Sequence, residues 1–303
     1  RPGAQPIDGY ATPARLAKRS LLLDIHGRGE RALAVGERGH ILLSTDSGKN
    51  WRQTIAPTRR TLTGVFLIDD QVAWAIGHQS VILKSGDGGE TWAKANAESD
   101  PETAYLDILF LDAMTGFIVG SYGKFLSTSD GGERWVETKQ DDDPHLSHII
   151  PAPGGGLWLT GEFGTVRRSG DRVRRWEPLA TPYEGTFFGA LPLAKGGAVV
   201  FGLRGNIFRS EDGKAWKQVE SPTQSLLHGG LALADGRLVL TAAAGQLLVS
   251  ADEGRSFRLA TMPGAESATA TSLWQAADGG VLLTSDKGVH RLELTDLKTE
   301  GAK

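Results

Sequence analysis

Two segments of the chain contain closely spaced charged residues or histidines that could bind a metal ion or a charged partner. The first is acidic and contains two histidines, Asp141-Asp142-Asp143-Pro144-His145-Leu146-Ser147-His148. Carboxylates and imidazoles are suitable ligands for a divalent cation. An acidic segment marked by proline is, however, more often a solvated loop between two elements. We therefore interpret this segment as a loop and expect no bound metal ion.

The second segment is a run of five arginines within nine residues: Arg167, Arg168, Arg172, Arg174 and Arg175. Neighbouring guanidinium groups repel one another, so a surface without a function would not favour such a run. Guanidinium groups bind carboxylates and phosphates well, which indicates a carboxylate-rich or lipid-headgroup partner. The alternative is a solvated outer strand whose basic side chains protect an exposed edge. Both interpretations stay open, and the five arginines are candidate partner-binding residues.

Enzymatic machinery with a recognisable motif is absent from the sequence. Its 303 residues contain no H-E-x-x-H, P-loop or G-x-S-x-G motif. The absence of cysteine excludes disulfide scaffolds, cysteine–zinc sites and thiol nucleophiles. We therefore expect no catalytic residues and no cofactor.

Composition narrows the class of partner. An apolar fraction of 40% is ample for a packed core and excludes wholesale disorder. The net charge of -3 argues against nucleic acid, because nucleic-acid domains carry a strong basic excess. No apolar run approaches the roughly 20 residues of a membrane helix, so we expect no direct membrane span.

A sequence segment that repeats along the chain predicts the fold that positions these side chains. A segment such as Ala73–Trp92 recurs six more times, the last time truncated, and a small residue in each copy is 40 to 43 residues from the next. These equivalent residues are Gly36, Gly77, Gly120, Gly161, Gly202, Ala242 and Ser285. Each copy is interpreted as four short strands, which predicts an all-β, seven-bladed β-propeller of four-stranded antiparallel blades. In this fold His148 is expected to face the wall of the central channel.

One turn in each copy follows the pattern Asp-x-Gly-x-x-Trp, as in Asp87-x-Gly89-x-x-Trp92. The carboxylate can accept bonds from the N–H groups of its own turn, and the aromatic residue can pack between blades. We interpret these carboxylates as structural: Asp46, Asp87, Asp130, Asp171, Asp212 and Asp252.

The seventh copy lacks this turn and a fourth strand. We predict that the N-terminal segment around Tyr10–Lys18 returns to supply that strand and so closes the ring. The predicted organisation is an N-terminal closing segment (1–19), the propeller (20–297) and a C-terminal tail (298–303).

The Asp-x-Gly-x-x-Trp turns resemble the BNR or Asp-box repeat, and together with the preceding strands they are similar to the Ycf48/HCF136 family over about residues 20–297. That resemblance implies a seven-bladed propeller that assists assembly of photosystem II. Proteobacterial relatives without photosystems look alike and are usually exported. The arginine patch of the photosystem factors does not transfer here, because the first strand of the fifth blade carries Thr186-Phe187-Phe188-Gly189.

A second turn, Gly-x-x-Gly, is expected to lie on one face around the channel mouth in every blade. Glycine is favoured there because hairpin turns need positive φ. The middle residues differ widely, and aromatic and arginine side chains are typical of binding hot spots. The candidate partner-binding residues on this face are Arg38, His78, Tyr122, Phe163 and Arg204. The alternative is ordinary turn variability.

We therefore predict a non-catalytic, exported binding scaffold or assembly factor for a membrane-associated protein complex. We expect a protein partner, a monomer, a periplasmic or otherwise exported location, and a signal peptide removed ahead of Arg1. The alternative is a carbohydrate-active BNR-repeat hydrolase or lyase with its site at the channel mouth, where Glu37 or Glu162 could act. Paired carboxylates in a deep pocket would favour the enzyme, and exposed aromatics and arginines would favour the scaffold.

Overall fold

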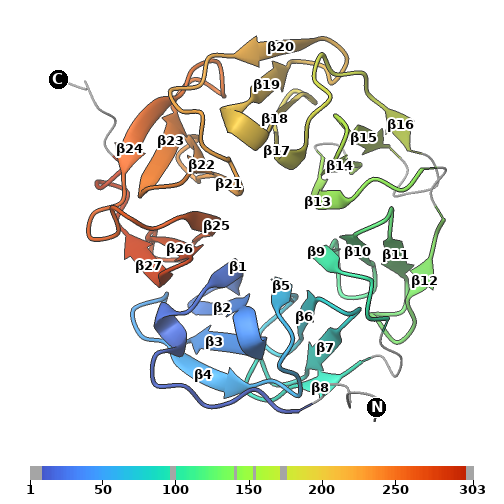
Figure 1. Ribbon diagram of the computed structural model, residues 1–303, viewed down its shortest axis with the longest axis vertical. Coiled ribbons are helices and arrows are strands. Elements are labelled where there is room, and N and C mark those ends of the chain that lie inside the picture. The colour runs from blue at the N-terminus through green and yellow to red at the C-terminus, as the bar shows by residue number, and fades with distance from the viewer. Residues whose placement is uncertain (1–8, 96–99, 140–141, 153–154, 171–175, 298–303) are drawn as a thin grey trace, which may run out of the picture.

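Seven antiparallel sheets surround a central axis in the computed structural model of the chain (Figure 1). The structure describes residues 9–95, 100–139, 142–152, 155–170 and 176–297. Helix is limited there to three 3-10 turns, η1 (Ala17–Arg19), η2 (Glu37–Gly39) and η3 (Leu203–Gly205). None of the helices in those ranges has the length and apolar character to cross a membrane. The predicted seven-bladed propeller is confirmed.

The strands of each blade follow one another outward from the axis. Blades 1 and 2 contain β1 (Leu22–Arg28), β2 (Arg31–Gly36), β3 (His40–Ser44), β4 (Arg52–Ile55), β5 (Leu62–Leu67), β6 (Ala73–Gly77), β7 (Ile82–Ser85) and β8 (Ala93–Lys94). Blades 3 and 4 contain β9 (Tyr105–Phe110), β10 (Gly116–Gly120), β11 (Phe125–Thr128), β12 (Val136–Glu137), β13 (Leu146–Pro151), β14 (Leu157–Gly161), β15 (Val166–Ser169) and β16 (Glu177–Pro178). Blades 5 and 6 contain β17 (Phe187–Pro192), β18 (Ala198–Gly202), β19 (Ile207–Ser210), β20 (Trp216–Val219), β21 (Gly230–Ala232), β22 (Leu238–Thr241), β23 (Gln246–Ser250) and β24 (Arg258–Thr261). Blade 7 contains β25 (Ala270–Gln275), β26 (Val281–Ser285) and β27 (Gly288–Leu292).

The second strand of a blade is sandwiched between neighbouring blades. Every residue of β6, β10, β14 and β18 is buried. A strand covered on both faces needs a continuous run of apolar or small residues, which is what the repeat provides at these positions. The hydrophobic clusters therefore lie between blades, and each joins residues of two adjacent sheets.

The Asp-box turn connects the third strand to the fourth and also contacts the preceding blade. Asp87 accepts hydrogen bonds from the Ser85 hydroxyl (2.8 Å) and from the backbone N–H of Thr91 (2.9 Å). The same hydroxyl bond recurs at Asp46, Asp130, Asp212 and Asp252, whereas Asp171 lies outside the described residues. The aromatic residue of the box packs on the blade before it, as where Trp135 lies 5.8 Å from Trp74.

We expect Asp87→Ala to lower the free energy of unfolding by about 1–2 kcal/mol, because the turn loses its main acceptor. Binding of any partner should stay nearly unchanged, since the turn follows the end of β7 and the Gly-x-x-Gly turn precedes its start. Thermal unfolding of the parent and the variant measures this loss. Glu102→Ala, which removes an exposed carboxylate, is the control. A variant that loses partner binding while keeping its melting temperature would contradict the structural role.

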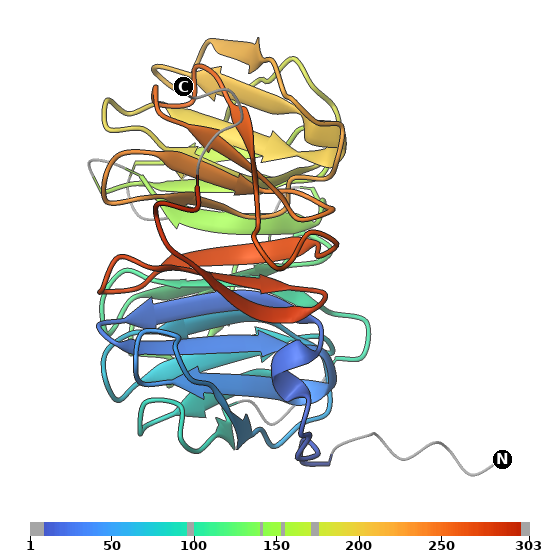
Figure 2. The same cartoon turned by 90° about the vertical axis from the view of Figure 1, so that its left-hand side faces the viewer.

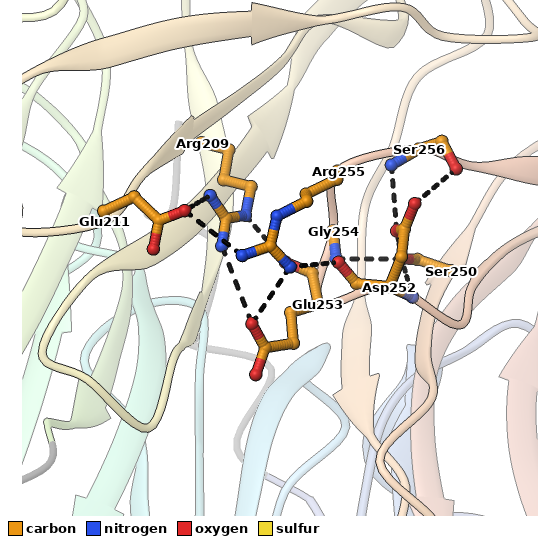
Figure 3. A network of polar contacts seen from close by, with 8 residues as sticks. All are labelled: Arg209, Glu211, Ser250, Asp252, Glu253, Gly254, Arg255 and Ser256. Atoms are coloured by element: carbon orange, nitrogen blue, oxygen red, sulfur yellow. Dashed lines mark hydrogen bonds and ion pairs between the residues drawn. The ribbon is translucent and has the colours of Figure 1, made fainter.

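Basic side chains connect one blade to the Asp-box turn of the next (Figure 3). Arg209 of β19 donates from Nε to the Glu253 carbonyl oxygen at 2.8 Å and from Nη1 to the Glu211 carboxylate at 2.7 Å. Arg255, inside the turn, contacts both carboxylates, Glu211 at 3.3 Å and Glu253 at 3.1 Å. Arginine in this third strand thus links blades 5 and 6.

The ring closes between blades 7 and 1 through side chains and the inner strands. Arg291 of β27 donates to the Ser47 carbonyl oxygen at 2.6 Å, and Ser47 has the place in its Asp-box that Glu253 has in blade 6. The Thr271 hydroxyl donates to the Leu22 carbonyl oxygen at 2.8 Å. These contacts join the two end blades without a shared sheet.

The predicted closure of blade 7 by Tyr10–Lys18 is not confirmed. This blade has three strands among the described residues, and the segment contains none. The Ala11 N–H donates to the Ala56 carbonyl oxygen at 2.8 Å, so the first part of the segment follows blade 1. Its last part, with η1, lies at one face of the ring and packs against blade 1 and against β27 of blade 7 (Figure 2). Pro13 within the segment has no N–H group for a strand ladder. The predicted tail 298–303 lies outside the described residues.

Candidate functional site

The Gly-x-x-Gly turns lie on the face where each inner strand begins. In blade 1 the Glu37 N–H donates to the Leu21 carbonyl oxygen at 3.0 Å, just before β1. Gly36 is extended (φ -174°), and a Cβ there would lie 2.1 Å from that same oxygen. Only the second glycine, Gly39, has positive φ (71°). The first glycine is therefore required by close backbone approach, not by positive φ as the sequence pattern suggested.

The first middle residue of the turn holds the incoming chain in four blades. Its side chain accepts the backbone N–H of the segment that leads into the inner strand. The pairs are Glu37 with Leu21 (3.3 Å), Ser121 with Ala104 (2.9 Å), Glu162 with His145 (3.0 Å) and Asp286 with Thr269 (2.7 Å). Glu37 and Glu162, the carboxylates considered for an enzyme, thus have a common structural contact.

The second middle residue projects its side chain from a left-handed backbone. Arg38, Tyr122, Phe163 and Arg204 have φ between 54° and 57°, a conformation that bulky residues rarely adopt. Tyr122 is 59% exposed and Phe163 is 77% exposed. Backbone strain of this kind gathers at functional sites, because the surrounding structure must hold it against its cost of roughly 1–3 kcal/mol per residue.

Tyr122 and Phe163 border one patch across blades 3 and 4. The Tyr122 ring meets the ring of His145 edge-on, with centroids 4.9 Å apart. His145 Nδ1 lies 3.8 Å from a Glu162 carboxylate oxygen, and Glu162 precedes Phe163 in its turn. We call Tyr122, His145, Glu162 and Phe163 the aromatic patch. It presents two large apolar bodies around a half-exposed polar centre.

The other candidates on this face are more dispersed. The Arg38 side chain is 79% exposed and lies 3.9 Å from the Glu37 carboxylate within its own turn. Arg204 is exposed on blade 5, next to Leu203, which is also exposed. His78 is exposed too, but Gln79 takes the left-handed position of that turn. The face therefore combines one aromatic patch with separate cationic side chains.

The basic run lies on the outer part of blade 4. Arg167 is 12% exposed and is bonded to Asp142. Arg168 lies 3.2 Å from Glu177 and donates to the Asp212 carbonyl oxygen of the next blade. Both described arginines thus have intramolecular partners. Arg172, Arg174 and Arg175 lie outside the described residues.

A second polar group lies inside the channel, on the inner strands. His148 of β13 approaches Asp107 of β9 with 2.6 Å between Nδ1 and a carboxylate oxygen. Asp107 also accepts the Ile149 N–H at 2.8 Å, so it bridges blades 3 and 4. Although burial alone lowers it, the Asp107 carboxylate raises the pKa of His148 above its ordinary value. His148 therefore lines the channel, at a cavity of about 110 Å³.

Asp24 of β1 lines the same cavity and bridges blade 1 to both of its neighbours. It accepts the Val65 N–H of blade 2 at 2.9 Å and the Ser272 hydroxyl of blade 7 at 2.8 Å. Burial, and then the Asp107 carboxylate, raises the pKa of Asp24 to about 6. Asp24 and Asp107 hold equivalent places after a bulge in their inner strands, a signal that aligning the seven copies could have revealed.

No cluster of three or more potential metal ligands occurs in the described ranges. In the acidic segment, His145 belongs to the aromatic patch while His148 lines the channel cavity, so the structure separates the two histidines. Asp141 lies outside the described residues.

A family model described as photosynthesis system II assembly factor YCF48 matches residues 95–257, more than half of the chain. A solved structure of YCF48 bound to a D1 peptide aligns with 96% of this chain and 99% of its own, at 15% identity and a TM-score of 0.76. YCF48 from Cyanidioschyzon merolae aligns with 94% of this chain and 99% of its own, at 18% identity and a TM-score of 0.72.

A structure of streptogramin B lyase is also similar, with 13% identity, a TM-score of 0.78, and coverage of 95% of this chain and 99% of that one. Identities this low show a shared fold alone. No curated protein matches the sequence.

Proposed function

Since the chain belongs to the family of the photosystem II assembly factor YCF48, we propose that it is a non-catalytic binding scaffold that helps a membrane-associated protein complex to assemble. A solved YCF48 structure holds a D1 peptide, which supports a protein or peptide as the partner class. The partner binds on the Gly-x-x-Gly face. Export to the periplasm or an equivalent compartment is part of the proposal.

The observation that carries this proposal is the exposure of the aromatic patch. Tyr122 and Phe163 are each more than half exposed on adjacent turns of one face. Large rings left in water lose the free energy that burial would gain, about 25 cal/mol per Å² of apolar surface. An exposed apolar patch rimmed by polar groups marks an interaction site.

The turns are suited to bind without reorganising. In blades 1 to 5 the turn is held by the close backbone contact of its first glycine, and in blades 1 and 4 also by a Glu carboxylate that accepts a backbone N–H of the incoming chain. A fixed backbone loses little conformational entropy when a partner binds. Arg38 and Arg204 supply positive charge on the same face for acidic groups of the partner.

A hydrolase or lyase at the channel mouth is the second candidate, and the channel group is what favours it. Asp24, Asp107 and His148 place two carboxylates and an imidazole on one cavity. A cavity of about 110 Å³ is small beside the roughly 300–1,000 Å³ of ordinary ligand sites. The bridging bonds of both carboxylates between blades further support a structural role.

We expect replacement of Tyr122 and Phe163 by Ser to weaken partner binding about tenfold or more, since loss of an aromatic anchor commonly costs above about 1.4 kcal/mol. Proteins enriched by the parent from cell-envelope extract would be identified by mass spectrometry. The affinity of the main one would then be measured with purified components.

Met114→Ser is the matched control, because Met114 is 53% exposed in the β9–β10 turn on the opposite face. It should leave the affinity unchanged, and both variants should keep the parent's melting temperature. Equal affinity of the parent and the double variant would mean that the partner binds elsewhere than on the aromatic patch. Turnover of glycosides by the parent would instead favour the enzyme.

A further inference from the structure

Blade 7 ends in an outer strand that has no further strand beside it. The other six blades have a fourth strand, whereas blade 7 ends at β27 in the part of the chain that the structure describes (Figure 1). β27 pairs with β26 in a continuous register from Gly288 to Leu292, without a bulge or a proline. Edge strands are usually blunted by such features, because unpaired N–H and C=O groups attract another strand. The edge of β27 is therefore regular enough to pair with one.

The first residue of this edge with outward backbone groups is Val289. It pairs with Thr284, the residue before Ser285, which is the seventh copy's equivalent of the first turn glycine. In blades 2, 3 and 4 the carbonyl oxygen at this position accepts an N–H of the chain that continues the fourth strand: Ile82 from Ala95, Phe125 from Thr138 and Val166 from Leu179, all at 2.9 Å. No N–H group in the described ranges donates to the Val289 carbonyl oxygen. Because outward-facing residues alternate along an antiparallel strand, Arg291 also turns its N–H and C=O to the open edge.

The segments of the described chain that lie near this edge are held elsewhere. After β27, Arg237 of blade 6 donates to the carbonyl oxygens of Leu294 and Leu297 at 3.4 Å, and Leu297 is buried between blades 6 and 7. Ahead of β1, the chain bonds blade 1 at Ala11. η1 packs against β27 at Gly288 but exchanges no backbone hydrogen bond with it. Neither of these segments therefore pairs with the edge.

Two cations lie at one end of the edge. Lys18 and Arg19 are exposed, and neither has a carboxylate partner among the described residues. Their backbone lies against Gly288, so closely that a Cβ there would meet it. The neighbouring Asp286 lies 3.9 Å from Lys287. A strand antiparallel to β27 ends beside Gly288, so its C-terminal end would meet the two cations.

We propose that the edge of β27 binds an extended segment of another protein as the fourth strand of blade 7, antiparallel to β27 and acidic at its C-terminal end. The backbone groups of Val289 and Arg291 supply the pairing, and Lys18 and Arg19 select the acidic end. Blades 6 and 1 on either side each have one strand more, so the edge lies one strand further in than its neighbours. A single strand fits there, since paired strands lie about 4.8 Å apart, whereas a second copy would bring a whole blade. The site is separate from the aromatic patch, and neither proposal rests on the other.

The test is amide hydrogen exchange of the whole chain, followed by NMR, with the peptide Thr-Lys-Gln-Val-Glu-Glu. This peptide copies Lys217–Glu220 of blade 5, flanked by a threonine and a further glutamate. Without peptide, the N–H groups of Val289 and Arg291 should exchange at least about tenfold faster than their equivalents Ile207 and Arg209, which face β20. Saturating peptide should slow their exchange about tenfold. A peptide that ends in Gln-Gln should bind about fivefold more weakly.

A proline at the edge tests the strand pairing. Val289→Pro removes the outward N–H but none of the bonds to β26, so the peptide should no longer protect Arg291. Val289→Thr keeps the N–H and the branched shape and is the matched control. Lys18→Gln with Arg19→Gln changes exposed side chains only, so it tests the site even where the proline variant does not fold. It should abolish the preference for the acidic peptide, with the melting temperature unchanged.

The double variant of Tyr122 and Phe163 should bind the peptide as the parent does, which separates this site from the aromatic patch. The proposal is overturned if neither peptide slows exchange at β27, or if the variant without the two cations still prefers the acidic peptide. Slow exchange of Val289 and Arg291 without peptide would also overturn it. That result would mean that the chain itself covers the edge, or a second copy where protection increases with protein concentration.

Discussion

Replacing Asp107 with alanine should lower the free energy of unfolding by about 3 kcal/mol, because a largely buried ion pair loses one partner. Asp107 is 16% exposed and lies 2.6 Å from His148. It also accepts backbone N–H groups from Ile108 and Ile149, both at 2.8 Å. All of these donors would be left without an acceptor. Thermal and denaturant unfolding of the parent and the variant measure the change, roughly 6 °C in melting temperature for a domain of this size.

A double-mutant cycle with His148→Ala isolates the pair. The double variant should lose less unfolding free energy than the sum of the two single losses. We expect this difference to be at least about 1 kcal/mol, since the two residues are in contact. His148→Ala alone leaves Asp107 with its two backbone donors and should have the smaller effect. Additive single changes, or a stable Asp107→Ala variant, would mean that the pair contributes little to the fold. The channel group would then be explained better by catalysis or binding.

The architecture was predictable because the repeat is strict where blades pack. Gly36, Gly77 and Gly120 recur because a Cβ at each would lie within 2.3 Å of a carbonyl oxygen of the chain entering the inner strand. Trp92 and Trp135 recur because each fills the space against the preceding blade. Contacts that every blade must make leave a periodic trace in the sequence.

Ring closure was not predictable in the same way, because the copy that lacks a fourth strand occurs once in the chain. Arg291 closes the ring by the contact to Ser47 that Arg209 makes to Glu253 between blades 5 and 6. Nothing in the spacing distinguishes such an arginine from one on a solvated edge. The missing fourth strand suggested that the N-terminus returns as a strand. The segment forms no strand: it bonds blade 1 at Ala11, and Ala17 packs against blades 1 and 7.

The candidate site was predicted in part for a related reason. The variable middle residues of the turns drew attention to Tyr122 and Phe163, which the structure places on one patch with His145. The channel group combines Asp24, Asp107 and His148, and Asp24 also bonds Ser272; all four residues follow a bulge in their inner strands. Aligning the seven copies could mark these positions as equivalent, but the sequence alone does not reveal the bulge.

Asp24 gives the protein an unusual dependence of stability on pH. A carboxyl whose pKa is about 6 in the folded state, against the ordinary 3.8, binds its proton more tightly when folded. Stability should therefore fall as pH rises from about 4 to about 6, by up to about 3 kcal/mol in total. The raised pKa of His148 acts at higher pH, where its contribution is lost as the imidazolium deprotonates.

We accordingly expect Asp24→Asn to be more stable than the parent by up to about 3 kcal/mol near pH 8 and to match it near pH 4. Asparagine can accept the Val65 N–H and donate to the Ser272 hydroxyl, so the contacts between blades persist. Asp70→Asn, at an exposed carboxylate, is the control and should follow the parent at both pH values. Unfolding by urea across this pH range measures the three proteins. A variant that is less stable than the parent at high pH would mean that the ionised carboxylate stabilises the fold. A gain in stability would mean that the fold uses the hydrogen bonds of this side chain to Val65 and Ser272, and not its negative charge.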